Sequence, residues 1–142
     1  MLRLEHSVIA PLSAAGTREI WVVFTGSDYI AGALAMAAGI AAVLSAQICI
    51  LAAQVVPYPL PLADPPVGPE FLERSLLDLA QEFDVDTTVE IYLCRDAAET
   101  LNQILPVGAT VVIGGRKRWW RTAEQRLADA LAQHQRTILF HE

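Results

Sequence analysis

A glycine pair followed by a dense group of cations is the part of this sequence best suited to chemistry. Residues 111–121 read VVIGGRKRWWR, so an apolar run typical of a buried strand ends in two glycines and then in a cationic turn. Glycines let an anion approach the backbone closely, and cations supply the complementary charge. The segment therefore predicts an anion site at the tip of a strand. A solvated turn that leads into a helix is the alternative reading.

The charge balance restricts the kind of anion. The chain of 142 residues has 10 Lys plus Arg against 16 Asp plus Glu, and half of the cations fall within residues 116–126. A local basic segment on an acidic body argues against general nucleic-acid binding and favours one phosphate or carboxylate contact. Stacking of Trp119 and Trp120 on a single strand stays open as a weaker alternative, but such a pair more often packs in a core or a subunit contact.

The rest of the chain alternates between strand and helix patterns. Its length is typical of one domain, and we expect residues 1–18 to form an irregular arm ahead of a domain over residues 19–142. Within the arm, the run SVIAPLS could be an added edge strand or disordered. Strands are expected at 19–24, 47–56, 88–94, 109–113 and 137–141, and helices at 28–45, 68–83, 96–105 and 120–134. Five strands separated by four helices predict an α/β three-layer sandwich with a mostly parallel sheet.

The stretch from Tyr29 to Ala63 has no charge and is long enough to cross a bilayer. Its first part is rich in Ala, as in a buried helix, and its second part has β-branched residues and ends at prolines, as in an interior strand. We therefore expect no membrane span. Cys49 and Cys94 lie far apart, each within a predicted strand, which favours buried thiols in a reducing, cytoplasmic setting.

Ligands of open parallel sheets bind at the carboxyl ends of strands, where the strand order reverses direction. Flavodoxin-like and related orders place the first strand near the middle. The loop after it, residues 25–28, should then face the loop after the fourth predicted strand, residues 114–118. Asp28 and Asp96 are expected to cap the helices that they begin.

The order of the elements and several strings resemble the universal stress protein family. The resemblance covers about residues 19–141 and is carried by EIWVVFTGSD, YLCRDAAETLNQIL and VGATVVIGGRKR at the first, third and fourth predicted strands. It implies a Rossmann-like fold, similar to that of the adenine nucleotide alpha hydrolases, and a part in the stress response. It also implies a homodimer formed through the C-terminal strand and, as in many members, a site for ATP.

The phosphate loop of the ATP-binding members is incomplete in this sequence. Their pattern is Gly, two residues, Gly, nine residues, then Gly and Ser or Thr. Counted from Gly114 or Gly115, the second glycine position holds Lys117 or Arg118, and no glycine follows Gly115. A full cradle of backbone amides cannot form, so side-chain cations and the hydroxyl of Thr122 would have to hold an anion instead.

A second departure concerns the adenine. Where the ATP-binding members end their first strand in an aspartate near the base, this chain has Phe24 and Thr25. We expect a cytoplasmic regulatory module that binds ATP, another adenine nucleotide or another phosphorylated small ligand without turnover. A degenerate, dimeric protein-interaction module that binds no nucleotide is the alternative.

No catalytic constellation and no set of metal ligands is apparent in the sequence, so we expect neither an enzyme nor a metal site. The residues expected to bind the ligand come from the two facing loops. They are Thr25, Gly26, Ser27, Asp28, Gly114, Gly115, Arg116, Lys117, Arg118, Arg121 and Thr122.

Overall fold

A computed structural model describes the backbone of residues 2–8 and the whole of residues 18–116 and 122–142. The expected ligand-binding cations Lys117, Arg118 and Arg121, and the tryptophan pair 119–120, lie outside the described residues.

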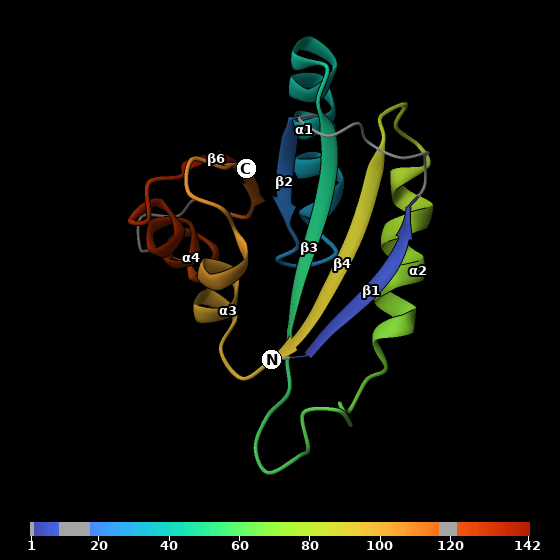
Figure 1. Cartoon of the computed structure of the whole chain (residues 1–142), viewed down its shortest axis with the longest axis vertical. Coiled ribbons are helices and arrows are strands. Elements are labelled where there is room, and N and C mark those ends of the chain that lie inside the picture. The colour runs from blue at the N-terminus through green and yellow to red at the C-terminus, as the bar shows by residue number, and fades with distance from the viewer. Residues whose placement is uncertain (1, 9–17, 117–121) are drawn as a thin grey trace.

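The described chain alternates between strands and helices from residue 19 onward, as the sequence predicts (Figure 1). The strands are β1 (Leu2–Val8), β2 (Glu19–Val23), β3 (Gln47–Val55), β4 (Thr87–Cys94), β5 (Thr110–Gly114) and β6 (Thr137–His141). The helices are α1 (Ile30–Leu44), α2 (Pro69–Ala80), α3 (Ala97–Ile104) and α4 (Ala123–Ala132).

The strands form one sheet in the order β1-β4-β3-β2-β5-β6. Strands β2 to β6 run parallel to their neighbours, which confirms the parallel α/β fold and the central place of β2. Strand β1 is an addition to this five-stranded core, and it pairs antiparallel with β4 at the edge of the sheet. The arm is therefore not wholly irregular: its described strand, residues 2–8, includes the first two residues of SVIAPLS, and the rest of that run lies outside the described residues.

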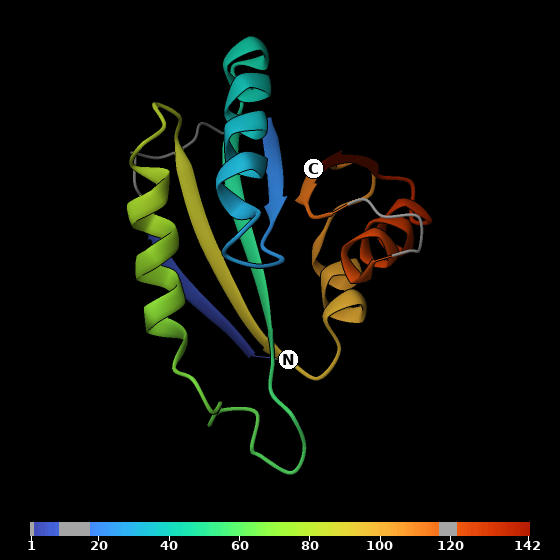
Figure 2. The same ribbon diagram turned by 180° about the vertical axis from the view of Figure 1, so that it is seen from behind.

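Helices cover both faces of the sheet and make the three layers. Helices α1 and α2 lie behind it in Figure 1 and in front of it in Figure 2, and α3 and α4 lie on the other face. The central strand β3 contributes side chains to the hydrophobic core on each face of the sheet. Ile48 and Ile50 pack with α1 and α2, whereas Cys49 and Leu51 pack toward α3 and α4. Burial on both faces explains the continuous apolar run of this strand.

The charge-free stretch forms α1 and β3, as predicted. Among the described residues, none of the helices combines the length and the apolar character that crossing a membrane would require.

The prediction that Asp28 caps α1 is wrong. The helix begins one residue later, with Tyr29 at the N-cap and no side-chain cap, because the preceding turn is closed by a hydrogen bond from Tyr29 N–H to Gly26 O at 3.3 Å. Asp96 does cap α3, and its carboxylate accepts from the N–H of Glu99 at 2.9 Å.

Arg136 joins the C-terminal ends of α3 and α4 from inside the protein. Its side chain is 8% exposed. It donates to Asn102 Oδ1 (2.5 Å), Asn102 O (2.9 Å), Leu105 O (2.6 Å), Pro106 O (3.3 Å) and Leu131 O (3.4 Å). Burial lowers the pKa of the guanidinium from its ordinary value. The hydrogen bonds offset this desolvation and satisfy carbonyls that the helix ends leave without partners.

Candidate functional site

The loops that follow β2 and β5 meet at the carboxyl edge of the sheet, as the topology predicts. The two strands are parallel neighbours in the middle of the sheet. Just beyond them, the hydroxyl of Thr25 donates to Gly114 O at 2.6 Å. The juxtaposition expected from the sequence is therefore confirmed, and it lies where the crossover connections reverse direction.

The loop after β2 is a tight turn. Gly26 has φ +152°, a conformation that side chains with a Cβ rarely adopt, so glycine is required here. The two following residues, Ser27 and Asp28, are exposed. Beyond them α1 begins, with its first N–H groups at this edge of the sheet.

Packing accounts for the glycine pair. A Cβ at Gly114 would lie 2.6 Å from Tyr29 O, and a Cβ at Gly115 would lie 2.6 Å from Glu124 Cβ and 2.9 Å from Phe140 Cζ. The N–H of Gly115 donates to His141 O at 3.0 Å. The two glycines thus let α1 and α4 approach the end of β5, and the Gly115 amide already has a partner.

Thr122 belongs to the start of α4. Its Oγ1 donates to Arg116 O at 3.0 Å and accepts from Gln125 N–H at 3.3 Å, while Gln125 Oε1 accepts from Thr122 N–H at 2.9 Å. This reciprocal capping box fixes the helix start after the basic segment, later than the sequence predicts. Arg116 is exposed next to it.

An open cleft of about 430 Å³ lies beside the bond between Thr25 and Gly114, a size typical of small-molecule sites. It is bounded by the end of β2 and by the first turns of α3 and α4. The described residues that line it are Phe24, Thr25, Ala97, Ala98, Ala123, Glu124, Arg126 and Leu127. Of these, only Thr25 is among the residues that the sequence singles out as ligand-binding.

The sequence does not identify the residues of α3 and α4 that line the cleft. Three of them, Ala97, Ala98 and Ala123, are alanines, whose side chains do not indicate a binding role. A usable signal exists in their position. Ala97 and Ala123 are the first residues of helices that follow the parallel strands β4 and β5, so they must lie at the carboxyl edge. Small residues at such positions leave room for a ligand.

Among the described residues, the cleft lining contains one anion, Glu124, and one cation, Arg126. Both helices that begin at the cleft already carry carboxylates in their first turns, Glu99 in α3 and Glu124 in α4. Negative charge there is stabilised by the helix dipoles. Within the described part of the chain, the carboxylate of Glu124 shows no hydrogen bond or ion pair, although its stem packs on Gly115.

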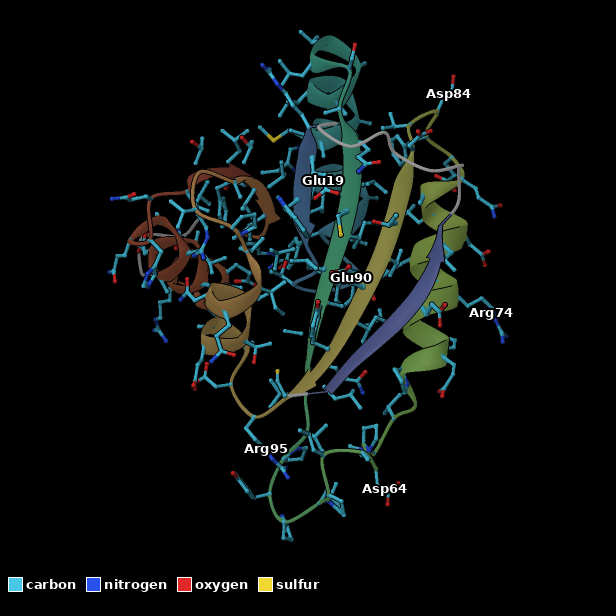
Figure 3. All side chains as sticks on the ribbon, in the orientation of Figure 1. Glu19, Asp64, Arg74, Asp84, Glu90 and Arg95 are labelled. Atoms are coloured by element: carbon cyan, nitrogen blue, oxygen red, sulfur yellow. The ribbon has the colours of Figure 1, made fainter. Side chains whose placement is uncertain are left out.

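A proline-rich loop, residues 57–68, occupies the same end of the molecule. Arg95 holds its start: Nη1 donates to Val56 O and Nη2 to Leu60 O, both at 2.8 Å, and the guanidinium lies 4.2 Å from the centre of the Tyr58 ring. Figure 3 shows Arg95 beside this loop. At the other end of the loop, Gln54 Nε2 donates to Val67 O at 2.7 Å. The loop is thus tied to the sheet at both ends.

The described residues contain no group of three or more His, Cys, Asp or Glu side chains that could hold a metal ion. Cys49 and Cys94 are both buried, as the sequence predicts.

Comparison with known proteins rests on structure alone, since neither a family model nor a curated protein matches the sequence. The universal stress protein from Archaeoglobus fulgidus superposes with a TM-score of 0.61 at 13% identity, over 88% of this chain and 93% of that one. The universal stress protein from the same organism in complex with dAMP gives 0.56 at 9%, over 89% and 98%.

A universal stress protein in complex with cAMP gives a TM-score of 0.57 at 19% identity, over 88% of this chain and 96% of that one. These likenesses span most of each chain and include the five parallel strands and the four helices. The chain has the fold of the universal stress proteins, and its sheet also contains the antiparallel strand β1.

Proposed function

We propose that this protein is a regulatory module of the universal stress protein type that binds an adenine nucleotide, without turnover, in the cleft at the carboxyl ends of β2 and β5. The observation that carries this proposal is the cleft itself, which lies beside the bond between Thr25 and Gly114 at the switch point of the sheet. Two structures of the same fold are complexes with dAMP and cAMP, which supports a nucleotide as the ligand.

The lining suits the parts of such a ligand. Phe24 and Leu127 offer apolar surface for a base, and the alanines leave room for it. Arg116 is exposed at the start of the basic segment, whose further cations Lys117, Arg118 and Arg121 remain predicted phosphate contacts. Ser27, Asp28 and the backbone around Gly26 remain predicted contacts on the other side.

Thermal unfolding with and without ATP tests this proposal, with inorganic triphosphate as the charge control. We expect ATP to raise the unfolding midpoint by several degrees, because ligand at a hundredfold excess over Kd stabilises by about 2.7 kcal/mol. Replacing Arg116 and Lys117 together by Ala should make the shift smaller, because the phosphates lose their charge contacts. Arg74→Ala is the matched control, since Arg74 is exposed on α2, away from the cleft (Figure 3).

The outcomes separate the hypotheses. An equal shift with triphosphate would reduce the site to an anion hole, and an unchanged affinity in the double variant would contradict the role of the cations. Absence of any shift would favour the second candidate function, a dimeric interaction module that binds no nucleotide. One observation favours that candidate: the Gly115 amide and the Thr122 hydroxyl are already engaged within the protein.

Self-association is proposed through β6, which lies at the edge of the sheet with the apolar sequence TILF. An unpaired edge strand offers N–H and C=O groups to a second copy of itself. Light scattering after size exclusion should therefore give the mass of two chains at micromolar concentration. A mass of one chain would contradict the proposal.

A further inference from the structure

Glu124 is one of the two charged residues in the described lining of the cleft, the other being Arg126, that the proposed function does not use. It occupies the first turn of α4, and the close approach of its Cβ and Cγ to Gly115 places its stem against the end of β5. The side chain is half-buried and lines the cleft. A carboxylate built into a mostly apolar cleft restricts which chemical group can lie next to it.

An ionised carboxylate only accepts hydrogen bonds. The part of a ligand beside Glu124 must therefore donate, as hydroxyl and amino groups do. Phosphate oxygens only accept at neutral pH, and they carry the same sign of charge as the carboxylate. A triphosphate placed against Glu124 would lose its hydration without gaining a partner.

Two of the described donors that a phosphate could use beside Glu124 are also occupied. Gly115 N–H binds His141 O, and the Thr122 hydroxyl donates to Arg116 O. The start of α3 is held by the Asp96 carboxylate, with Glu99 in the first turn. Both helix starts at the cleft are thus already compensated by negative charge, which weakens their attraction for a further anion.

We infer that the cleft recognises the nucleoside half of its ligand, with Glu124 accepting hydrogen bonds from the ribose hydroxyls and the phosphates left at the rim on the side of Arg116. This inference rests on the proposed function. The geometry of a vicinal diol suits it, because two neighbouring O–H donors match the two oxygens of one carboxylate. Carboxylates accept hydrogen bonds from ribose hydroxyls in other nucleotide-binding α/β folds.

Calorimetric titration of the whole chain with adenosine, 2′-deoxyadenosine, ATP and inorganic triphosphate tests the inference. We expect adenosine to bind within about tenfold of ATP, because the phosphates contribute little, and deoxyadenosine to bind about tenfold more weakly than adenosine, as the loss of a hydrogen bond to a charged group predicts. Inorganic triphosphate alone should bind far more weakly than adenosine.

Glu124→Gln keeps the volume and removes the charge. In this variant the ratio of the affinities for adenosine and deoxyadenosine should fall several-fold toward one. The ratio of the affinities for ATP and adenosine should be at least as high as in the wild type. Glu99→Gln is the matched control, because it removes a carboxylate from the first turn of α3 that does not line the cleft. Glu124→Ala also removes the carboxylate and should lower the ribose preference in the same way. Its unfolding midpoint shows whether the variant is folded.

Two results would overturn the inference while leaving the proposed function intact. One is an unchanged ribose preference in the folded Glu124 variants. The other is ATP binding more than about a hundredfold tighter than adenosine, with triphosphate competing for the site, a difference far beyond one exposed charge contact. If none of the four compounds binds, the proposed function itself fails, and the inference fails with it.

Discussion

Replacement of Arg136 by Met should lower the free energy of unfolding by about 3 kcal/mol. The guanidinium is the shared donor for five acceptors contributed by Asn102, Leu105, Pro106 and Leu131. Without it, several carbonyls at the ends of α3 and α4 remain buried and unsatisfied, at about 1–3 kcal/mol for each that water cannot reach. Methionine fills a similar length of space, so the loss reports the hydrogen bonds more than a cavity.

Urea unfolding followed by circular dichroism measures this change. Arg136→Lys should recover only part of the stability, because an ammonium cannot reproduce the planar fork of donors. Arg74→Met on the exposed face of α2 is the control, and it should stay within about 0.5 kcal/mol of the wild type. A loss below about 1 kcal/mol in Arg136→Met would show that water replaces the guanidinium.

The lowered pKa of Arg136 also determines the direction in which this group changes the stability with pH. Because folding disfavours the charged form, the unfolded chain binds its proton more tightly than the folded chain. Stability from this group would therefore rise with pH only as strongly alkaline solution deprotonates it. Near neutral pH the guanidinium is charged in both states, and it adds no slope to the pH dependence of unfolding.

Gly114→Ala should destabilise the protein by about 1–3 kcal/mol, the usual cost of adding atoms to a packed site. The new Cβ would lie 2.6 Å from Tyr29 O and 2.8 Å from Tyr29 Cβ. Since the first of these is a backbone atom, a side-chain rotation cannot relieve the contact. The start of α1 would have to move away from β5, and the bond between Thr25 and Gly114 would be strained with it.

Gly39→Ala is the matched control for this prediction. Gly39 lies in the exposed face of α1, and a Cβ there would meet nothing within 4 Å. The same substitution should therefore stabilise by about 0.5–1 kcal/mol, the difference in helix propensity between the two residues. Chemical denaturation of both variants checks the pair, and equal stabilities would show that β5 does not hold α1 through Gly114.

The parallel core could be predicted because its signal is local. Strand β3 carries an apolar run that only a strand covered on both faces requires, and Asp96 begins α3 with an N-cap side chain. Strand β1 does not carry such a local signal. Its sequence LRLEHSV mixes charged and apolar residues, and its pairing with β4 is settled by a partner far along the chain.

Some residues of the candidate site could also be predicted from the sequence, and others could not. Topology alone brings the ends of β2 and β5 together, so Thr25 and Gly114 could be placed from the sequence. The alanine walls and Glu124 could not, because their role comes from the helix starts that converge on the cleft. The sequence of the glycine pair predicts an anion contact, whereas the structure gives the pair a packing role against Tyr29 and Glu124.

The pairing of β1 with β4 has a consequence for synthesis. Leu2 pairs with Leu93, about ninety residues later, so β1 must wait for that stretch to be made before its partner exists. At typical rates of translation this delay is on the order of ten seconds. Throughout it, Arg3 and Glu5 give the solitary strand charges that discourage pairing with other nascent chains. Strand β1 can thus join the sheet only after the three strands that follow it in the sequence have been made.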